Sequence, residues 1–134
     1  LTWRAPKQTK VGDVITVGVD LNSGFALRGA PLRLGYDRER LALLEVREGD
    51  YFKQGQVPTN FTQNIDSGAG RADFGILRAP MSGTPGRGSV VDLTFRALAA
   101  GTAELSVRGF EPFVIGEGNP QTTLPAPLKI EVKP

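Results

Sequence analysis

The stretch from Gly29 to Asp50 reads GAPLRLGYDRERLALLEVREGD, and it decides the fold class. Apolar residues recur at every second position on both sides of an acidic turn at Tyr36-Asp37, with one change of phase after Leu43. A helix over the same residues would have to accommodate a proline and several glycines, which weaken helices. The stretch therefore predicts two β-strands joined by a turn, and an all-β protein.

The rest of the chain repeats this pattern in short pieces separated by turns. Alternating or apolar segments predict further strands at residues 14–21, 59–66, 72–78, 91–95, 103–107, 110–115 and 128–132. Asn22-Ser23-Gly24 is predicted to be a turn, residues 66–70 a hairpin loop, and residues 79–88 a long exposed loop. About nine strands without a convincing helix predict a two-sheet sandwich.

The composition fits one domain over residues 1–134, with 17 Gly, 10 Pro and a hydrophobic fraction of 40%. The net charge is only +2, and acidic and basic residues are interleaved, so no nucleic-acid-binding stripe is predicted. No apolar run approaches the roughly 18 residues of a membrane helix, so no membrane insertion by this domain is expected. Because the chain begins at Leu1 without a signal pattern, we expect it to be an excised piece of a longer polypeptide.

Catalytic chemistry has few residues to use, because the chain contains neither His nor Cys. The usual nucleophile–base pairs, thiolates and transition-metal clusters are excluded on that ground. The carboxylate pairs Asp37 with Glu39 and Glu48 with Asp50 are interpreted as solvated turn residues. The loop at 66–70 lacks a second nearby acid for calcium. No catalytic residue, metal site or cofactor is predicted.

The aromatic residues bear on carbohydrate binding, which often uses a planar strip of rings. Trp3, Tyr51 and Phe52 form the one candidate surface platform in the sequence. The others are expected in the core or at its edge: Phe25, Tyr36, Phe61, Phe74, Phe95, Phe110 and Phe113. A carbohydrate-binding module therefore remains an alternative function that requires the three platform residues to converge.

The order of the sequence pieces resembles the cohesin family of β-sandwich domains. The matching pieces are Val11-Gly12-Asp13, Gly24 to Tyr36-Asp37, Leu41 to Gly49, Phe61 to Asp66, Gly70-Arg71 to Leu77, and Gly88 to Phe95. The resemblance implies a jelly-roll sandwich of about nine strands, as in several carbohydrate-binding modules. It also implies non-catalytic binding, with one flat sheet face receiving a partner such as a dockerin.

Two positions depart from the dockerin-binding pattern of that family. Cellulosomal cohesins carry polar Asn and Asp side chains on the strand before the Tyr-Asp turn, where this chain has Gly29 and Pro31. Neither residue supplies a side-chain hydrogen bond, and an unpaired buried polar group costs on the order of 1 to 3 kcal/mol. This departure counts against a dockerin partner.

A narrower resemblance concerns three segments, LTWRAPK at the start, EGDYFKQG in the middle and LPAPLKIEV near the end. They look like cohesin-type domains appended to the C-terminal side of secretins, the outer-membrane channel subunits of bacterial type II secretion. This implies an exported accessory domain in the periplasm or at the outer membrane. Its partner would be a secretion component, its own oligomer or an exported substrate.

The candidate docking surface is the sheet face that carries small and mixed-charge outward residues beside an exposed apolar loop. Its predicted partner-binding residues are Arg33, Gly35, Asp73, Gly75, Leu77 and Met81. Besides carbohydrate binding, the alternative is a structural spacer within an extracellular assembly, which requires no specific ligand.

Overall fold

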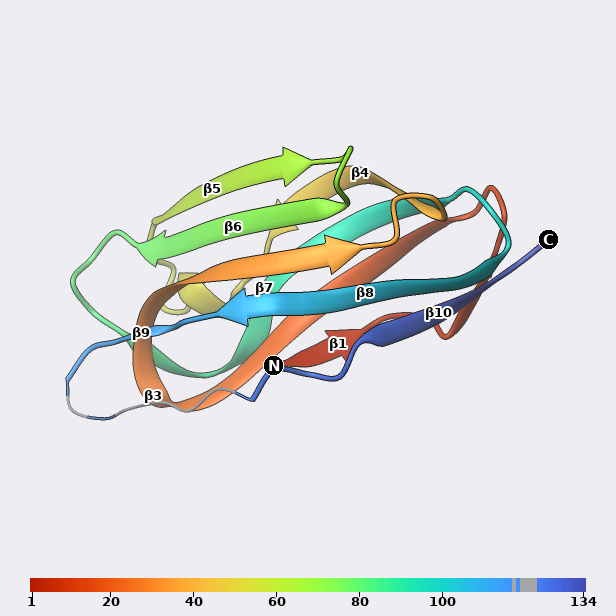
Figure 1. The fold of residues 1–134 in the computed structure, drawn as a ribbon. Helices are drawn as coiled ribbons and strands as arrows, with labels where there is room; N and C mark the ends of the chain where they lie inside the picture. The colour runs from red at the N-terminus through yellow and green to blue at the C-terminus, as the bar shows by residue number, and fades with distance from the viewer. Residues whose placement is uncertain (117, 119–122) are drawn as a thin grey trace.

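The computed structural model describes residues 1–116, 118 and 123–134. These residues form ten strands and one short 3-10 helix, arranged as two packed layers (Figure 1). In chain order they are β1 (Thr2–Arg4), β2 (Gln8–Lys10), β3 (Val14–Tyr36), β4 (Leu41–Glu48), η1 (Tyr51–Lys53), β5 (Thr59–Asp66), β6 (Arg71–Arg78), β7 (Thr84–Ala97), β8 (Gly101–Phe110), β9 (Phe113–Val114) and β10 (Leu128–Lys133).

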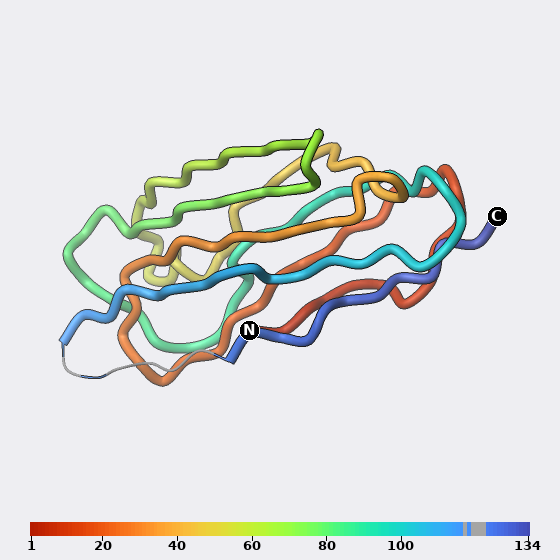
Figure 2. The backbone as a smooth tube through the Cα atoms, viewed as in Figure 1, coloured from red at the N-terminus to blue at the C-terminus, as the bar shows by residue number. Residues whose placement is uncertain are grey.

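The long strand β3 belongs to both layers. Its N-terminal half pairs with β7 and β1, and its C-terminal half pairs with β6, β8 and the short β9. We call the layer with the strand order β5-β6-β3-β8-β10-β2 the front layer. We call the layer with the order β4-β7-β3-β1 the back layer. Figure 2 shows β3 turning over at one end of the molecule to pass from one layer to the other.

The turn predicted at Asn22-Ser23-Gly24 is wrong, because these residues remain part of β3. The pairing register with β7 shifts between Ser23 and Leu27, at the place where the strand bends. A strand that bends sharply needs small and polar residues at the bend, and the same residues are typical of turns. The sequence signal was therefore real, but it marks a bend within one strand.

Period-2 alternation builds the core between the layers. In β3 the alternate residues Ile15, Val17 and Val19 are buried, and so are Leu32 and Leu34. Burying a side chain of this size stabilises the fold by about 1.5–3 kcal/mol. The all-β prediction and the two-sheet jelly-roll sandwich are confirmed.

The change of phase in the second half of the opening stretch is a β-bulge in β4. The register between β4 and β7 shifts between Leu43 and Glu45, which leaves Leu44 half exposed. β4 pairs with β7 and lies in the back layer, so the turn at Asp37 carries the chain from one layer to the other. Asp37 stabilises this turn, since its side chain accepts a hydrogen bond from the Glu39 amide at 3.1 Å.

The predicted hairpin of residues 59–66 and 72–78 is confirmed as β5 and β6, with Asp66 opposite Arg71. The following loop is shorter than expected, because β7 begins at Thr84 rather than after residue 88. Thr84 is buried, and its carbonyl oxygen accepts a hydrogen bond from the Tyr51 hydroxyl at 3.0 Å. That contact anchors the start of β7 despite its glycine-rich and proline-containing sequence.

The N-terminal segment is attached to both layers. β1 runs antiparallel to the N-terminal half of β3, and β2 runs parallel to β10. Trp3 is half-buried, and its indole nitrogen donates a hydrogen bond to the carbonyl oxygen of Ala126 at 3.0 Å. These contacts hold the beginning and the end of the chain against each other.

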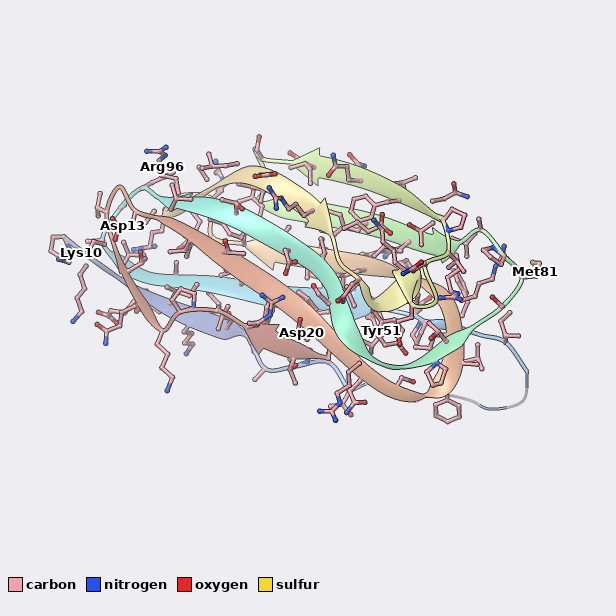
Figure 3. All side chains as sticks on the ribbon, turned by 180° about the vertical axis from the view of Figure 1, so that it is seen from behind. Lys10, Asp13, Asp20, Tyr51, Met81 and Arg96 are labelled. Atoms are coloured by element: carbon pink, nitrogen blue, oxygen red, sulfur yellow. The ribbon has the colours of Figure 1, made fainter. Side chains whose placement is uncertain are left out.

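The predicted aromatic surface platform is wrong. Tyr51 and Phe52 are 0% and 1% exposed, because η1 folds inward between β7, β3 and β6 (Figure 3). Phe25 and Phe113 were expected in the core or at its edge, and this is also wrong, because they are 39% and 53% exposed. The apolar segment after Asp50 fills the space between the layers and is unavailable to a ligand.

Burial of Tyr51 makes stability depend on alkaline pH. Burial raises the pKa of the Tyr51 hydroxyl above its ordinary value. The unfolded chain therefore loses this proton first, and stability present below about pH 10 is lost as the pH rises through the raised pKa. Urea unfolding from about pH 8 to about pH 11 should show this decline, and Tyr51→Phe should show a smaller one. An equal decline in both proteins would contradict the assignment.

Candidate functional site

The outward side of β5, β6, β8 and the C-terminal half of β3 forms one continuous surface, which we name the flat face. The pairing register places Arg33 opposite Asp73, Pro31 opposite Gly75 and Gly35 opposite Arg71. Leu77 lies in the next row, opposite Gly29. The inward residues between them, such as Phe74 and Ile76, are buried. Five of the six predicted partner-binding residues therefore lie together on one face.

Met81, the sixth predicted residue, does not lie on the flat face. It belongs to the loop between β6 and β7 and is 75% exposed at one end of the molecule (Figure 3). Part of this loop is held in place, because Arg28 Nε donates to the carbonyl oxygens of Arg78 and Pro80, each at 3.2 Å. Met81 can contact only a partner that extends past the end of β6.

Two strands contribute face residues that the sequence reasoning did not identify. β5 places Asn60, Thr62 and Asn64 opposite Leu77, Gly75 and Asp73. β8 places Ser106 opposite Gly35, and Arg108 follows Ser106 by two positions on the same strand. The alternation that assigns these residues to an outward face is visible in the sequence. What the sequence does not reveal is which strands are neighbours.

Glycines on the flat face leave room for arginine side chains to lie along the sheet. A Cβ atom at Gly35 would lie 3.3 Å from Arg108 Cδ and 3.1 Å from the Ser106 hydroxyl. A Cβ atom at Gly109 would lie 3.7 Å from Arg33 Cδ. Arg108 therefore leans from β8 over β3, and Arg33 leans from β3 over β8. The two side chains cross the same pair of strands in opposite directions.

The charges of the flat face are largely unpaired. Among the described residues, no carboxylate lies within 4.0 Å of a guanidinium nitrogen of Arg33, Arg71 or Arg108. Asp73 Oδ1 is enclosed and has no hydrogen-bond partner within the same part of the chain. A buried oxygen without a partner costs about 1–3 kcal/mol. The exposed guanidinium groups of Arg33, Arg71 and Arg108, in contrast, keep N–H donors that another molecule can reach.

One end of the flat face is apolar. Gly29 lies between Leu77 of β6 and Phe113 of β9, and a Cβ atom at Gly29 would lie 3.0 Å from Leu77 Cδ1. Phe113 and Leu77 lie on either side of Gly29 in the same row of the flat face, and Phe113 is 53% exposed. An exposed aromatic ring beside a leucine is typical of the core of a protein interface.

The back layer carries a network of charges that pair with one another. Arg4 donates to Asp20 Oδ2 at 3.1 Å and to Asp92 Oδ1 at 2.6 Å. These two hydrogen bonds raise the pKa of the Arg4 guanidinium, Asp20 contributing more than Asp92. Gly18 lies beneath Arg4 and gives it room to cross the sheet. This network connects β1, β3 and β7 within the protein. Its three side chains therefore have little remaining charge or hydrogen-bonding capacity for a partner.

Catalytic and metal-binding constellations are not found among the residues that the structure describes. Within them, no three His, Cys, Asp or Glu side chains are grouped so as to hold a metal ion. In the same part of the chain, no helical segment has the length and hydropathy needed to cross a bilayer. A sandwich with an open, partly unpaired sheet face has the features of a binding module.

Comparison with known proteins gives this binding module a family. The model of the cohesin domain matches residues 3–126, so the chain belongs to the cohesin family. Cohesin domains are non-catalytic protein-interaction modules, which confirms the expectation that the chain is not an enzyme. No curated protein sequence matches the chain. The narrower resemblance to secretin-appended domains has no counterpart in these findings and stays a prediction.

Several solved structures share the fold at low sequence identity. A type II cohesin domain from the cellulosome of Acetivibrio cellulolyticus is 16% identical with a TM-score of 0.75, over 96% of this chain and 92% of that one. The third cohesin of ScaC from the same organism, solved with the ScaB dockerin, is 14% identical with a TM-score of 0.77, over 99% and 100%. A non-cellulosomal cohesin from Archaeoglobus fulgidus is 21% identical with a TM-score of 0.68, over 96% and 81%.

Proposed function

We propose that this cohesin domain docks a protein partner on its flat face. The observation that carries the proposal is a cluster of unpaired charges on this face. Arg33, Arg71 and Arg108 are exposed and have no carboxylate within 4.0 Å among the described residues. Unpaired charges beside an exposed apolar end are typical of a surface that meets another protein.

The finer proposal concerns the parent protein. We propose that the domain is an accessory part of a longer, exported chain, the outer-membrane secretin of a type II secretion system. The support is the resemblance of the segments LTWRAPK, EGDYFKQG and LPAPLKIEV. The domain would then lie in the periplasm or at the outer membrane. Its partner would be another secretion component, a second copy of the secretin or an exported substrate.

A dockerin is the second candidate partner, because similar cohesins from Acetivibrio cellulolyticus and Clostridium thermocellum were solved in complexes with dockerins. The flat face of this chain offers different chemistry at one place. Gly29 and Pro31 lie on its outward side and present no polar side chain there. A dockerin that depends on polar contacts at this position would lose them.

Carbohydrate binding is not supported by the position of the aromatic rings. Tyr51 and Phe52 are buried, and Trp3 is half-buried and hydrogen-bonded to Ala126. These three residues therefore form no exposed platform on which a sugar ring could stack.

The test is to capture partners from the envelope fraction of the source cells and then measure direct binding of the purified partner. Leu77→Asp and Gly75→Arg are expected to weaken that binding by about tenfold or more, because each places a charge or a long side chain on the flat face. Thr16→Asp is the matched control, since Thr16 is exposed on the back layer. A panel of dockerins is measured in parallel.

Equal binding by Leu77→Asp, Gly75→Arg and the unmodified domain would discard the flat face as the docking surface. Capture of secretion components would support the secretin proposal. Tight binding of a dockerin that is lost in both flat-face variants would favour the second candidate instead.

A further inference from the structure

We infer that the partner presents carboxylate groups to three arginines, Arg33, Arg71 and Arg108, that surround Gly35 on the flat face. This inference rests on the proposed function, because it specifies the chemistry of the partner at the proposed docking surface. We name these three residues the arginine triad.

The triad converges because Gly35 has no side chain. Arg71 lies directly opposite Gly35 on β6, and Arg108 leans over Gly35 from β8. Arg33 precedes Gly35 by two positions on β3 and therefore points outward on the same face. Three strands thus contribute one arginine each to the area around a single glycine.

Two shallow hollows connect the triad. The first is lined by Gly35, Arg71 and Arg108, by Thr102, Glu104 and Ser106 of β8, and by residues of the neighbouring turns. The second is lined by Arg33, Arg108 and Gly109, among others. Because Arg108 lines both hollows, they adjoin, and a side chain of a partner can reach the triad from either one.

The guanidinium groups of the triad are open to a ligand. No hydrogen bond or ion pair to these three groups exists among the described residues. A planar guanidinium presents a fork of N–H donors that matches the two oxygens of a carboxylate. The stems of Arg33 and Arg108 already lie along the sheet, so binding orders fewer of their rotatable bonds than it would for freely extended side chains.

Among the described residues, four acids besides Asp73 lie near the triad, and none is within 4.0 Å of its guanidinium nitrogens. Asp37 pairs with Arg40 at 2.9 Å, and Asp66, which lies opposite Arg71, accepts the Ala69 amide at 3.2 Å. Glu104 lines the first hollow and Glu111 the second.

Asp73 lies opposite Arg33, as Asp66 lies opposite Arg71. Arg33 leans away from it toward Gly109, and one carboxylate oxygen of Asp73 is enclosed. The area around Gly35 therefore carries charges of both signs, and the triad is distinguished by guanidinium groups that have no carboxylate within 4.0 Å among the described residues.

A polypeptide partner fits this surface better than a nucleic acid. The chain as a whole carries a net charge of only +2, whereas duplex binding draws on many distributed basic contacts. On the same face, Asn64 lies opposite Asp73, and Asn60, Leu77 and Phe113 lie further along the sheet in the row of Gly29. A protein segment can supply carboxylates, hydrogen bonds and an apolar side chain at these three places.

The test is a selection of random dodecapeptides displayed on phage, with the domain as the immobilised target. Peptides enriched on the unmodified domain are expected to contain at least about twice the input fraction of Asp and Glu. The strongest peptide is then synthesised, and its Kd is measured at about 50 and about 500 mM NaCl, where screening should weaken it severalfold. Arg33→Glu, Arg71→Glu and Arg108→Glu should each weaken it by about fivefold to tenfold.

The matched control is Arg96→Glu, which makes the same change of charge at an exposed residue of the back layer (Figure 3). It should bind the peptide as the unmodified domain does, and circular dichroism verifies that every variant is folded. If the enriched peptides are neutral or basic and Leu77→Asp abolishes their binding, the inference is overturned while the flat face remains the docking surface. Peptides insensitive both to Leu77→Asp and to the three triad substitutions would overturn both proposals. No enrichment at all, or preferred binding of a duplex DNA, would overturn the inference.

Discussion

Replacing Phe52 with alanine is expected to lower the free energy of unfolding by about 3–5 kcal/mol. Phe52 is 1% exposed, and its ring packs edge-on against Tyr51 with the ring centroids 4.9 Å apart. Its carbonyl oxygen accepts a hydrogen bond from the buried Arg78 guanidinium at 3.0 Å. Truncation leaves a cavity where η1 packs between the layers, and that cavity can collapse only by moving the backbone that Arg78 holds.

Phe113→Ala provides the matched control, because it deletes the same ring at a position that is 53% exposed. A surface change of this kind is expected to alter stability by no more than about 0.5 kcal/mol. Guanidinium unfolding of both variants and of the unmodified domain measures the difference. If Phe52→Ala were as stable as Phe113→Ala, Phe52 would not be a core residue, and an aromatic platform near Tyr51 would again become a candidate site.

The sequence predicts many of the strands because burial alternates along them, most clearly in β3, β6 and β8. Phe74 and Ile76 are buried and their neighbours Asp73 and Gly75 are only half-buried, as period 2 requires. Alternation does not tell which strand lies beside which. The segments at 91–95 and 103–107 follow each other in the chain, yet they lie in β7 and β8 and pair with different halves of β3.

Local composition predicts bends and turns less well, because the same residues serve several purposes. Asn22-Ser23-Gly24 looks like a turn but forms the bend of a continuous strand. Tyr51-Phe52 follows a polar turn and looks like an exposed platform, but it fills the core. In both places the contacts that decide the outcome come from residues distant in the sequence, and no local pattern records them.

The candidate site is predicted in part for the same reason. Arg33, Gly35, Asp73, Gly75 and Leu77 were identified because alternation sends them outward, and antiparallel pairing of β3 with β6 brings them together. The roles of Gly35 and Gly109 could not be predicted. Each makes room for an arginine from the neighbouring strand, and this depends on the register between β3 and β8, which shifts after Arg33.

The second large effect is expected at Gly29, the position where the resemblance to cellulosomal cohesins implies a polar side chain. Gly29→Asn is expected to destabilise the domain by about 1–3 kcal/mol. A Cβ atom at this position would overlap the carbonyl oxygen of Ile76, which is backbone of the paired strand β6 and can yield only if the strand moves. Differential scanning calorimetry against the unmodified domain measures the loss as a lower Tm.

Gly24→Asn is the matched control, because it makes the same substitution in the same strand at a glycine with no atom within 4 Å of the added Cβ. Its stability should stay within about 0.5 kcal/mol of the unmodified domain. If Gly29→Asn were equally well tolerated, the close approach of β3 to β6 would not restrict this position, and a dockerin-type contact could be installed by substitution. If it is destabilised as expected, the glycine is required by the packing of the two strands themselves. The missing polar contact is then built into the sheet, and a partner of the flat face has to find its hydrogen bonds and charges elsewhere, at the arginine triad and the amides of β5.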